Sequence, residues 1–292
     1  MASTSAQPDT TAKKACLNPD CSNEATKRCS KCKAVRFCGP DCQALLWDSH
    51  KAFCKSMAKE PEASVLLLDG LGCLGPRNFY TKGAQAALAR AGAKVATVDV
   101  TKKPGLFDQV GHVLSEAGRF TSCIILSLGA AEIDAEQEFA ANMNFRQKLC
   151  SWVERGGRLI VRSERPIGNW PEWFGKTWEH NDYRRTTHEC RAKSRDDAHW
   201  CKWYPEAQGA VTTSINVKAV MMTCVPTEEI LFGTTSSSVS HSLVPFMAGL
   251  EVEEGLAAVA LGKFGQGSVS FFGDVNAEET TCAIMAVIAR GP

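Results

Sequence analysis

Seven cysteines and one histidine lie within 39 residues near the start of this 292-residue chain. In order they are Cys16, Cys21, Cys29, Cys32, Cys38, Cys42, His50 and Cys54. A structural zinc ion takes four thiolate or imidazole donors and no water. Eight such donors therefore predict two structural Zn²⁺ ions, with no open position at which a water could be activated for hydrolysis.

A disulfide framework or a chance cluster would be the alternative to metal binding. The Cys-x2-Cys spacing at Cys29 and the His-x3-Cys spacing at His50 are typical of metal ligands, and no secretion signal opens the sequence. A segment this short also buries too little apolar surface to offset its chain entropy. Metal binding should therefore supply most of its folding free energy, and chelation should unfold it.

The same segment resembles a MYND-type zinc finger. The matching residues are 36–43 (RFCGPDCQ), Trp47 and 50–54 (HKAFC). The resemblance implies a cross-brace, with one zinc on Cys16, Cys21, Cys38 and Cys42 and the other on Cys29, Cys32, His50 and Cys54. Spacing alone gives eight ligands and leaves a sequential pairing open. The gap between the first two cysteines is longer than is usual in the family.

The resemblance also implies a protein partner. In related fingers the residues that correspond to Gln43 and Trp47 line a shallow groove for a short proline-containing peptide. The alternative for Trp47 is that its indole covers the small core of the finger.

Composition and charge limit the other partners. The net charge is +1, and residues 1–60 hold ten Lys and Arg against six Asp and Glu, so neither part has the basic excess of a phosphate-backbone binder. No run of 18 apolar residues predicts a membrane span. Half of the 14 cysteines are finger ligands and the rest are scattered, which suits a reducing compartment. We expect a nuclear or cytoplasmic protein without membrane or nucleic-acid partners.

The chain divides into a disordered tail (1–14), the finger (15–55), a charged linker (56–63) and an α/β domain (64–292). Apolar runs alternate there with helical patterns, which predicts a mostly parallel sheet flanked by helices. We expect strands at 64–69, 94–100, 123–128, 158–162, 256–262 and 268–273, and helices at 81–91, 106–117, 134–155 and 280–289. Asn276 and Glu279 predict a capping box for the last helix.

This domain resembles class I glutamine-amidotransferase-like sandwiches, including ThuA-like relatives, which implies a flavodoxin-like arrangement. An amidotransferase needs a cysteine nucleophile on a strand-to-helix elbow and a histidine that a carboxylate orients. Residues 129–131 (GAA) stand at the elbow, and His180 in 180–182 (HND) is the nearest imitation of the histidine. We therefore expect a non-catalytic domain. The chain also lacks the signatures of SET methyltransferases.

A second interpretation of this domain is a small-ligand or nucleotide site. Gly70, Gly72 and Gly75 form G-x-G-x-x-G after an apolar strand, and Asp99 ends the next one. Such glycines let a backbone approach a pyrophosphate, and the acid binds ribose hydroxyls. Pro76 and Gly83 disturb the helix that should follow, so a plain glycine-rich turn is the alternative.

Residues 169–204 are interpreted as an aromatic insertion, because they hold five of the seven tryptophans. If they form a hairpin, a third metal could be held by His188, Cys190, His199 and Cys201. Otherwise these four residues pack or face solvent. The aromatic side chains favour a surface that faces a protein partner.

Overall fold

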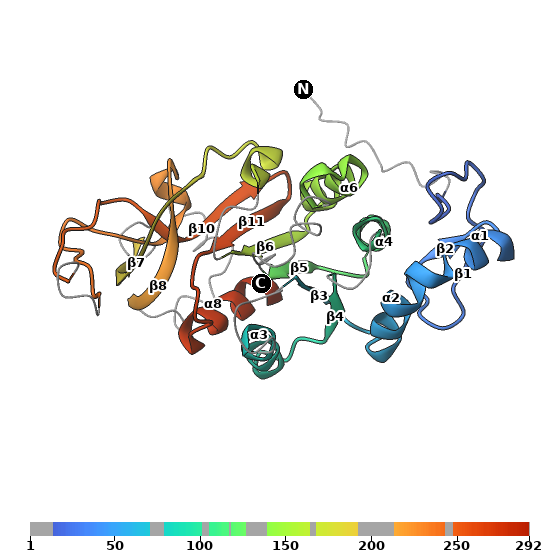
Figure 1. Cartoon of the computed structure of the whole chain (residues 1–292), viewed down its shortest axis with the longest axis horizontal. Helices are drawn as coiled ribbons and strands as arrows, with labels where there is room; N and C mark the ends of the chain where they lie inside the picture. Colours follow the sequence, from blue (N-terminus) through green and yellow to red (C-terminus); the bar gives the residue numbers. More distant parts are fainter. Residues whose placement is uncertain are drawn as a thin grey trace, which may run out of the picture.

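The computed structural model describes residues 14–70, 79–100, 105–116, 118–126, 139–163, 168–191, 213–242 and 248–291. A small N-terminal module, residues 15–59, lies at one end of a larger α/β domain (Figure 1). The domain is built on one nine-stranded sheet in the order β4-β3-β5-β6-β11-β10-β8-β7-β9. Within the described residues no helix combines the length and apolar character that crossing a membrane requires.

The first five strands in this order are parallel. They are β4 (Val95–Asp99), β3 (Val65–Asp69), β5 (Ser122–Leu126), β6 (Arg158–Arg162) and β11 (Gly267–Phe272). Each lies within two residues of its predicted range. Their continuous apolar runs are typical of strands that are covered on both faces.

Helices cover both faces of this parallel half. On one face Leu66 and Leu68 join a core with α4 (Leu106–Ser115) and α6 (Met143–Glu154). On the other face Val65 and Leu67 pack with α3 (Phe79–Arg90) and α8 (Glu279–Arg290). The period-two alternation of strand side chains thus divides one apolar run between two cores.

Two predicted helices differ from the expectation in how they are capped. The helix expected at 134–155 is interrupted at Asn142: residues 139–141 are helical, and α6 begins anew at Met143, where the Asn142 side chain accepts the N–H of Phe145 and caps it. The predicted start at residue 134 lies outside the described residues. The capping box predicted for Asn276 and Glu279 does not form at α8. Asp274 takes that place, accepting the backbone N–H groups of Asn276 and Glu278.

The other half of the sheet is antiparallel, which corrects the prediction of a mostly parallel sheet. It contains β7 (Glu179–Cys190), β8 (Ser214–Thr223), β9 (Ile230–Gly233) and β10 (Ala257–Phe264). A two-residue turn joins β10 to β11, so this pair must be antiparallel. Since β9 pairs with both β7 and β10, strands β10, β8, β7 and β9 close into a ring.

Residues 169–191 are part of this architecture and not a peripheral insertion. β7 pairs with β8 along most of its length. Trp170 and Trp178 are buried and stand edge to face, with ring centroids 6.1 Å apart. The prediction that these aromatics face a partner is therefore wrong for both tryptophans, and Trp173 is partly buried against the same core. Trp200 and Trp203 lie outside the described residues.

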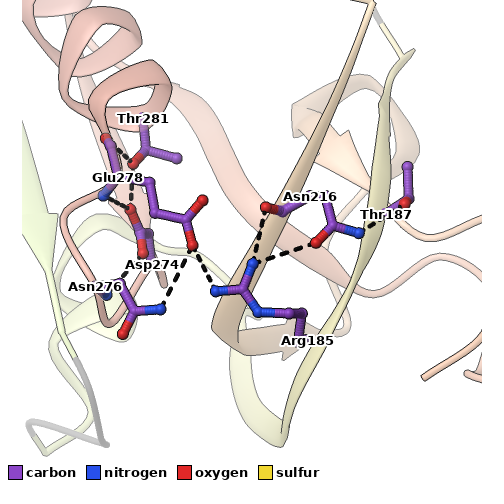
Figure 2. A network of polar contacts seen from close by, with 7 residues as sticks. All are labelled: Arg185, Thr187, Asn216, Asp274, Asn276, Glu278 and Thr281. Atoms are coloured by element: carbon purple, nitrogen blue, oxygen red, sulfur yellow. Dashed lines mark hydrogen bonds and ion pairs between the residues drawn. The ribbon is translucent and has the colours of Figure 1, made fainter. Parts of the chain in front are cut away.

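A polar network ties the antiparallel half to the start of α8 (Figure 2). Arg185 of β7 donates to the backbone and side-chain oxygens of Asn216 in β8 and, at 2.7 Å, to Glu278 Oε1. Asn276 also donates to Glu278, and Thr281 donates to the buried Asp274. These bonds fix the beginning of α8 against the sheet.

His188 of β7 gives a pH prediction. It is fully buried, and among the described residues neither ring nitrogen has a hydrogen-bond partner. Burial lowers its pKa to about 4, below the ordinary value of about 6.5. The unfolded chain thus binds the proton more readily, and stability that is complete above pH 6.5 is lost as the pH falls toward 4.

We expect His188→Leu to reduce the loss of unfolding free energy between pH 7.5 and pH 5 by on the order of 1–2 kcal/mol relative to the wild type. Denaturant unfolding at the two pH values measures it. His241→Leu, which changes an exposed histidine and keeps the buried ring, is the matched control. An equal loss in the His188→Leu variant and the wild type would contradict the prediction.

Candidate metal centre

The N-terminal module is built around its ligand pairs. A two-stranded antiparallel ribbon, β1 (Lys27–Arg28) and β2 (Arg36–Phe37), places Cys29 and Cys38 at its opposite ends, one in each cluster, and Lys33 at φ 56° closes the knuckle between the strands. Cys42 lies in α1 (Pro40–Leu45). His50 and Cys54 lie four residues apart in α2 (Trp47–Lys59), so they project from one face of that helix.

The first cluster joins Cys16, Cys21, Cys38 and Cys42, whose sulfur atoms all lie within 4.8 Å of one another. The Cys38 sulfur is 3.5 Å from those of both Cys21 and Cys42. The backbone N–H of Cys38 points to the sulfur of Cys16, and the Asn18 amide points to that of Cys42. Such donors stabilise thiolates.

The second cluster joins Cys29, Cys32, His50 and Cys54, again within 4.8 Å, and all four are buried. The Cys29 and Cys54 sulfur atoms are 3.7 Å apart, and Cys32 Sγ is 3.7 Å from His50 Nε2. The Phe37 ring stands edge-on to the imidazole. The other ring nitrogen, Nδ1, lies 3.1 Å from Gln109 Oε1 in α4.

Both donor sets fit a tetrahedral Zn²⁺ ion. Zinc–sulfur bonds of about 2.3 Å place the sulfur atoms of a tetrahedron roughly 3.8 Å apart, close to the separations here and far beyond a disulfide bond. Every cysteine of the two clusters is a free thiol. The clusters interleave along the sequence, so the cross-brace is confirmed and the sequential pairing is excluded.

Three of the ligands hold protons that a metal must displace. Hydrogen bonding with Cys42 and Cys21 raises the pKa of Cys38 to about 12, and burial together with the charge of Cys32 raises that of Cys54 to about 12. Burial lowers the pKa of His50, but hydrogen bonds with Cys32 and Cys29 raise it to about 9. Zinc binds thiolates and neutral imidazole, so metal binding releases protons at both clusters.

The module is docked on the α/β domain through α4. Glu116 at the end of α4 pairs with Arg28 at 2.7 Å and with Arg36 at 2.8 Å. The backbone N–H of Arg36 donates to His112 Nε2 at 3.3 Å. Burial, followed by the charge of Lys148, lowers the pKa of His112 to about 4, so its ring is neutral and can accept this bond.

Apolar packing continues across the same contact. Phe53 and Met57 of α2 belong to the core that contains Phe107 and Val110 of α4. Helix α2 packs against both β4 and α4. It runs through Lys59, so the first residues of the stretch predicted as a linker are helical, and Met57 is fully buried.

The predicted small-ligand residues are only partly described. Gly70 follows β3, and Asp99 ends β4 in register with Asp69. Gly72 and Gly75 lie outside the described residues. So do His199 and Cys201, which leaves the third metal untested, and residues 129–131 of the elbow. His180 packs edge-on against Phe271, and burial lowers its pKa to about 4.

A hollow that sequence reasoning missed lies at the same edge of the sheet, where β5, β6 and β11 end. It lies between α3 and α8 and leaves about 10 Å³ for the centre of a water-sized molecule, and its walls include Tyr80, Arg162, Asp274 and Cys282. The guanidinium of Arg162 lies 3.6 Å from the centre of the Tyr80 ring and donates to the backbone oxygen of Asp274. Its only sequence signal was an arginine that ends an apolar strand.

Paired substitutions test the cross-brace. Cys16→Ser with Cys42→Ser removes two ligands of one cluster, so we expect one zinc per chain to remain. Cys16→Ser with Cys29→Ser removes one ligand from each cluster and should leave none. Metal analysis of purified full-length chains measures both. The reverse result, no zinc in the first pair and one in the second, would be that of a sequential pairing.

The comparisons with known proteins support the finger. Residues 16–54 match the model of the family described as MYND finger, and all eight ligands lie within the match. No curated protein matches the chain.

Among solved structures the likeness is weak. A beta-galactosidase from Bacillus circulans sp. alkalophilus has a TM-score of 0.42 at 10% identity over 81% of this chain and 34% of its own. The IFT52 N-terminal domain has a TM-score of 0.41 at 13% identity, over 76% of this chain and 94% of its own. The cytoplasmic protein STM3548 from Salmonella typhimurium has a TM-score of 0.39 at 12% identity, over 77% of this chain and 97% of its own. The chain spans about a third of the beta-galactosidases it matches. TM-scores below 0.5 assign neither a fold family nor an activity. Residues 16–54 are thus a MYND finger with two metal clusters, and the α/β domain is defined by its mixed sheet.

Proposed function

We propose that this chain is a zinc-dependent adaptor whose finger binds a short proline-containing peptide of a partner protein. The observation that carries the proposal is the direction in which the finger is docked. Its contacts with α4 come from β1, β2 and α2, whereas none of the six residues of α1 is buried. In Figure 1 α1 lies at the outer end of the finger, away from the sheet.

The outward side carries the residues that a peptide would need. Trp47 is 39% exposed and Leu45 is 71% exposed, although both are large and apolar. Gln43 is half-buried and lies four positions before Trp47, across the junction of α1 and α2. An exposed indole beside an amide suits a proline ring and its neighbouring carbonyl group. Leu45 extends the pair predicted from the sequence.

The α/β domain serves in this proposal as a rigid, non-catalytic support. Its parallel strands, numbered along the chain, have the order 2-1-3-4-5, which supports a flavodoxin-like and amidotransferase-like ancestry. The reduced cysteines suit a nuclear or cytoplasmic location.

Trp47→Ala tests the peptide surface. We expect at least a 30-fold weaker affinity for proline-containing peptides, because truncating an aromatic anchor costs about 2 kcal/mol or more, while both zinc ions are retained. Fluorescence titration of a peptide library measures the affinity. Tyr183→Ala removes a similarly exposed aromatic from β7 and should bind as the wild type does. Saturable binding that Trp47→Ala leaves unchanged would refute the proposal.

The hollow supports a second candidate function, the binding of a small anionic or aromatic ligand by the α/β domain. Ligands of open α/β sheets bind outside the carboxyl ends of the strands, where Arg162 and Tyr80 line the hollow. It leaves about 10 Å³ for the centre of a water-sized molecule, room for roughly one water and far less than most ligand pockets offer. We therefore propose that it receives only one small group of a ligand, such as a carboxylate. Gly70 follows β3, and Asp99 ends the neighbouring β4 at this edge.

A thermal-shift screen of nucleotides and small carboxylates tests this candidate. We expect a stabilising ligand whose effect disappears in Ala84→Leu, which fills the hollow from α3 while keeping Arg162. The stability of the unliganded variant is the baseline, because overpacking itself costs about 1–3 kcal/mol. A flat screen, or a shift that Ala84→Leu preserves, would exclude a site in the hollow.

A further inference from the structure

One contact links a metal ligand of the finger to a residue far along the chain. His50 Nδ1 and Gln109 Oε1 are 3.1 Å apart, and both side chains are buried, with Gln109 3% exposed. His50 Nε2 is the nitrogen that faces the thiols, because it lies 3.7 Å from Cys32 Sγ. The Gln109 oxygen can only accept, so Nδ1 carries the proton and donates it.

We propose that Gln109 is a positioning residue of the second zinc site, through which the α/β domain completes a metal site that the finger alone leaves unfinished. A metal-ligating histidine generally donates its second ring N–H to a carbonyl or carboxylate, which fixes its tautomer and orientation and raises its basicity. In this chain that acceptor comes from α4. Gln109 binds no metal itself and acts through the imidazole.

The surrounding contacts hold the two side chains in register. Glu116 receives Arg28 and Arg36 near one end of α4, and Arg119 donates to the backbone oxygen of Cys32, itself a ligand of the second site. Phe53, three residues after His50, packs in the core shared with α4. Docking therefore delivers the Gln109 oxygen to the imidazole, and zinc binding and docking become a single coupled equilibrium.

The first cluster differs in this respect. Its described outer contacts come from the finger itself: the Cys38 N–H reaches Cys16, and the Asn18 amide reaches Cys42. Among the described residues no α4 side chain forms a hydrogen bond with its four ligands. The two zinc ions should thus differ in kind, the first held by the finger alone and the second held jointly by the finger and the α/β domain.

The test is zinc release from the full-length chain to a chromophoric chelator. In Gln109→Met, which keeps the length of the side chain and removes its acceptor, one zinc should be released at a 10–100-fold lower chelator strength, the usual effect of losing such a partner. The other zinc should be unaffected. Gln109→Glu restores an acceptor and should restore wild-type release. Gln85→Met, which removes the hydrogen bond that Gln85 of α3 donates to Thr97 of β4, is the matched control.

Two further readouts separate positioning from a general loss of structure. Cobalt substitution distinguishes the site with one histidine ligand from the all-cysteine site by its absorption, and the weakened site should be the one that contains the histidine. In a His50→Cys background the imidazole is gone, so Gln109→Met should no longer change metal affinity. The proposal is overturned if Gln109→Met behaves as Gln85→Met does, if both metals weaken equally, or if the effect persists without His50.

Discussion

Eight metal ligands within 39 residues leave the finger almost no interior of its own, because cysteine and histidine occupy the positions that larger apolar side chains would fill. The few that remain, such as Phe37, Phe53 and Met57, do not form a separate core. They continue into the core between α4 and the sheet. Metal coordination and docking on the α/β domain therefore support one another, and the module acts as a layer of the larger fold.

The finger packs on the face of the sheet that α4 and α6 cover, beside α4 and next to β4. Helices α3 and α8 cover one face of the parallel half, and α4 and α6 cover the other. Beyond α4 the finger adds α2 against the same core and against the edge strand β4. Helix α2 precedes the connection from Lys59 to Ala63, and α4 comes later in the chain. Both pack in the same core, so the apolar core is continuous between the finger and the α/β domain.

Much of this could be predicted from the sequence, and the limits have physical causes. Ligand spacing identified both metal sites because the coordination chemistry is local, and continuous apolar runs such as 65–69 identified the parallel strands. The strand β7 was not predicted, because residues 179–190 read EHNDYRRTTHEC and lack the apolar alternation of a half-buried strand. The hydrogen bond between His50 and Gln109 could not be predicted either, because it joins residues 59 positions apart. No spacing rule connects an amide on one helix to a ligand on another.

The two edges of the sheet differ, and the difference affects how a fragment without the finger would behave. At its antiparallel end the ring of β10, β8, β7 and β9 leaves no open edge among the described strands. At the other end β4 has β3 as its one neighbour among the described strands, and α2 of the finger packs against it. Exposed edge strands recruit other chains. A fragment that begins after the finger would present β4 without the helix that packs against it, and we expect it to self-associate more readily than the longer chain.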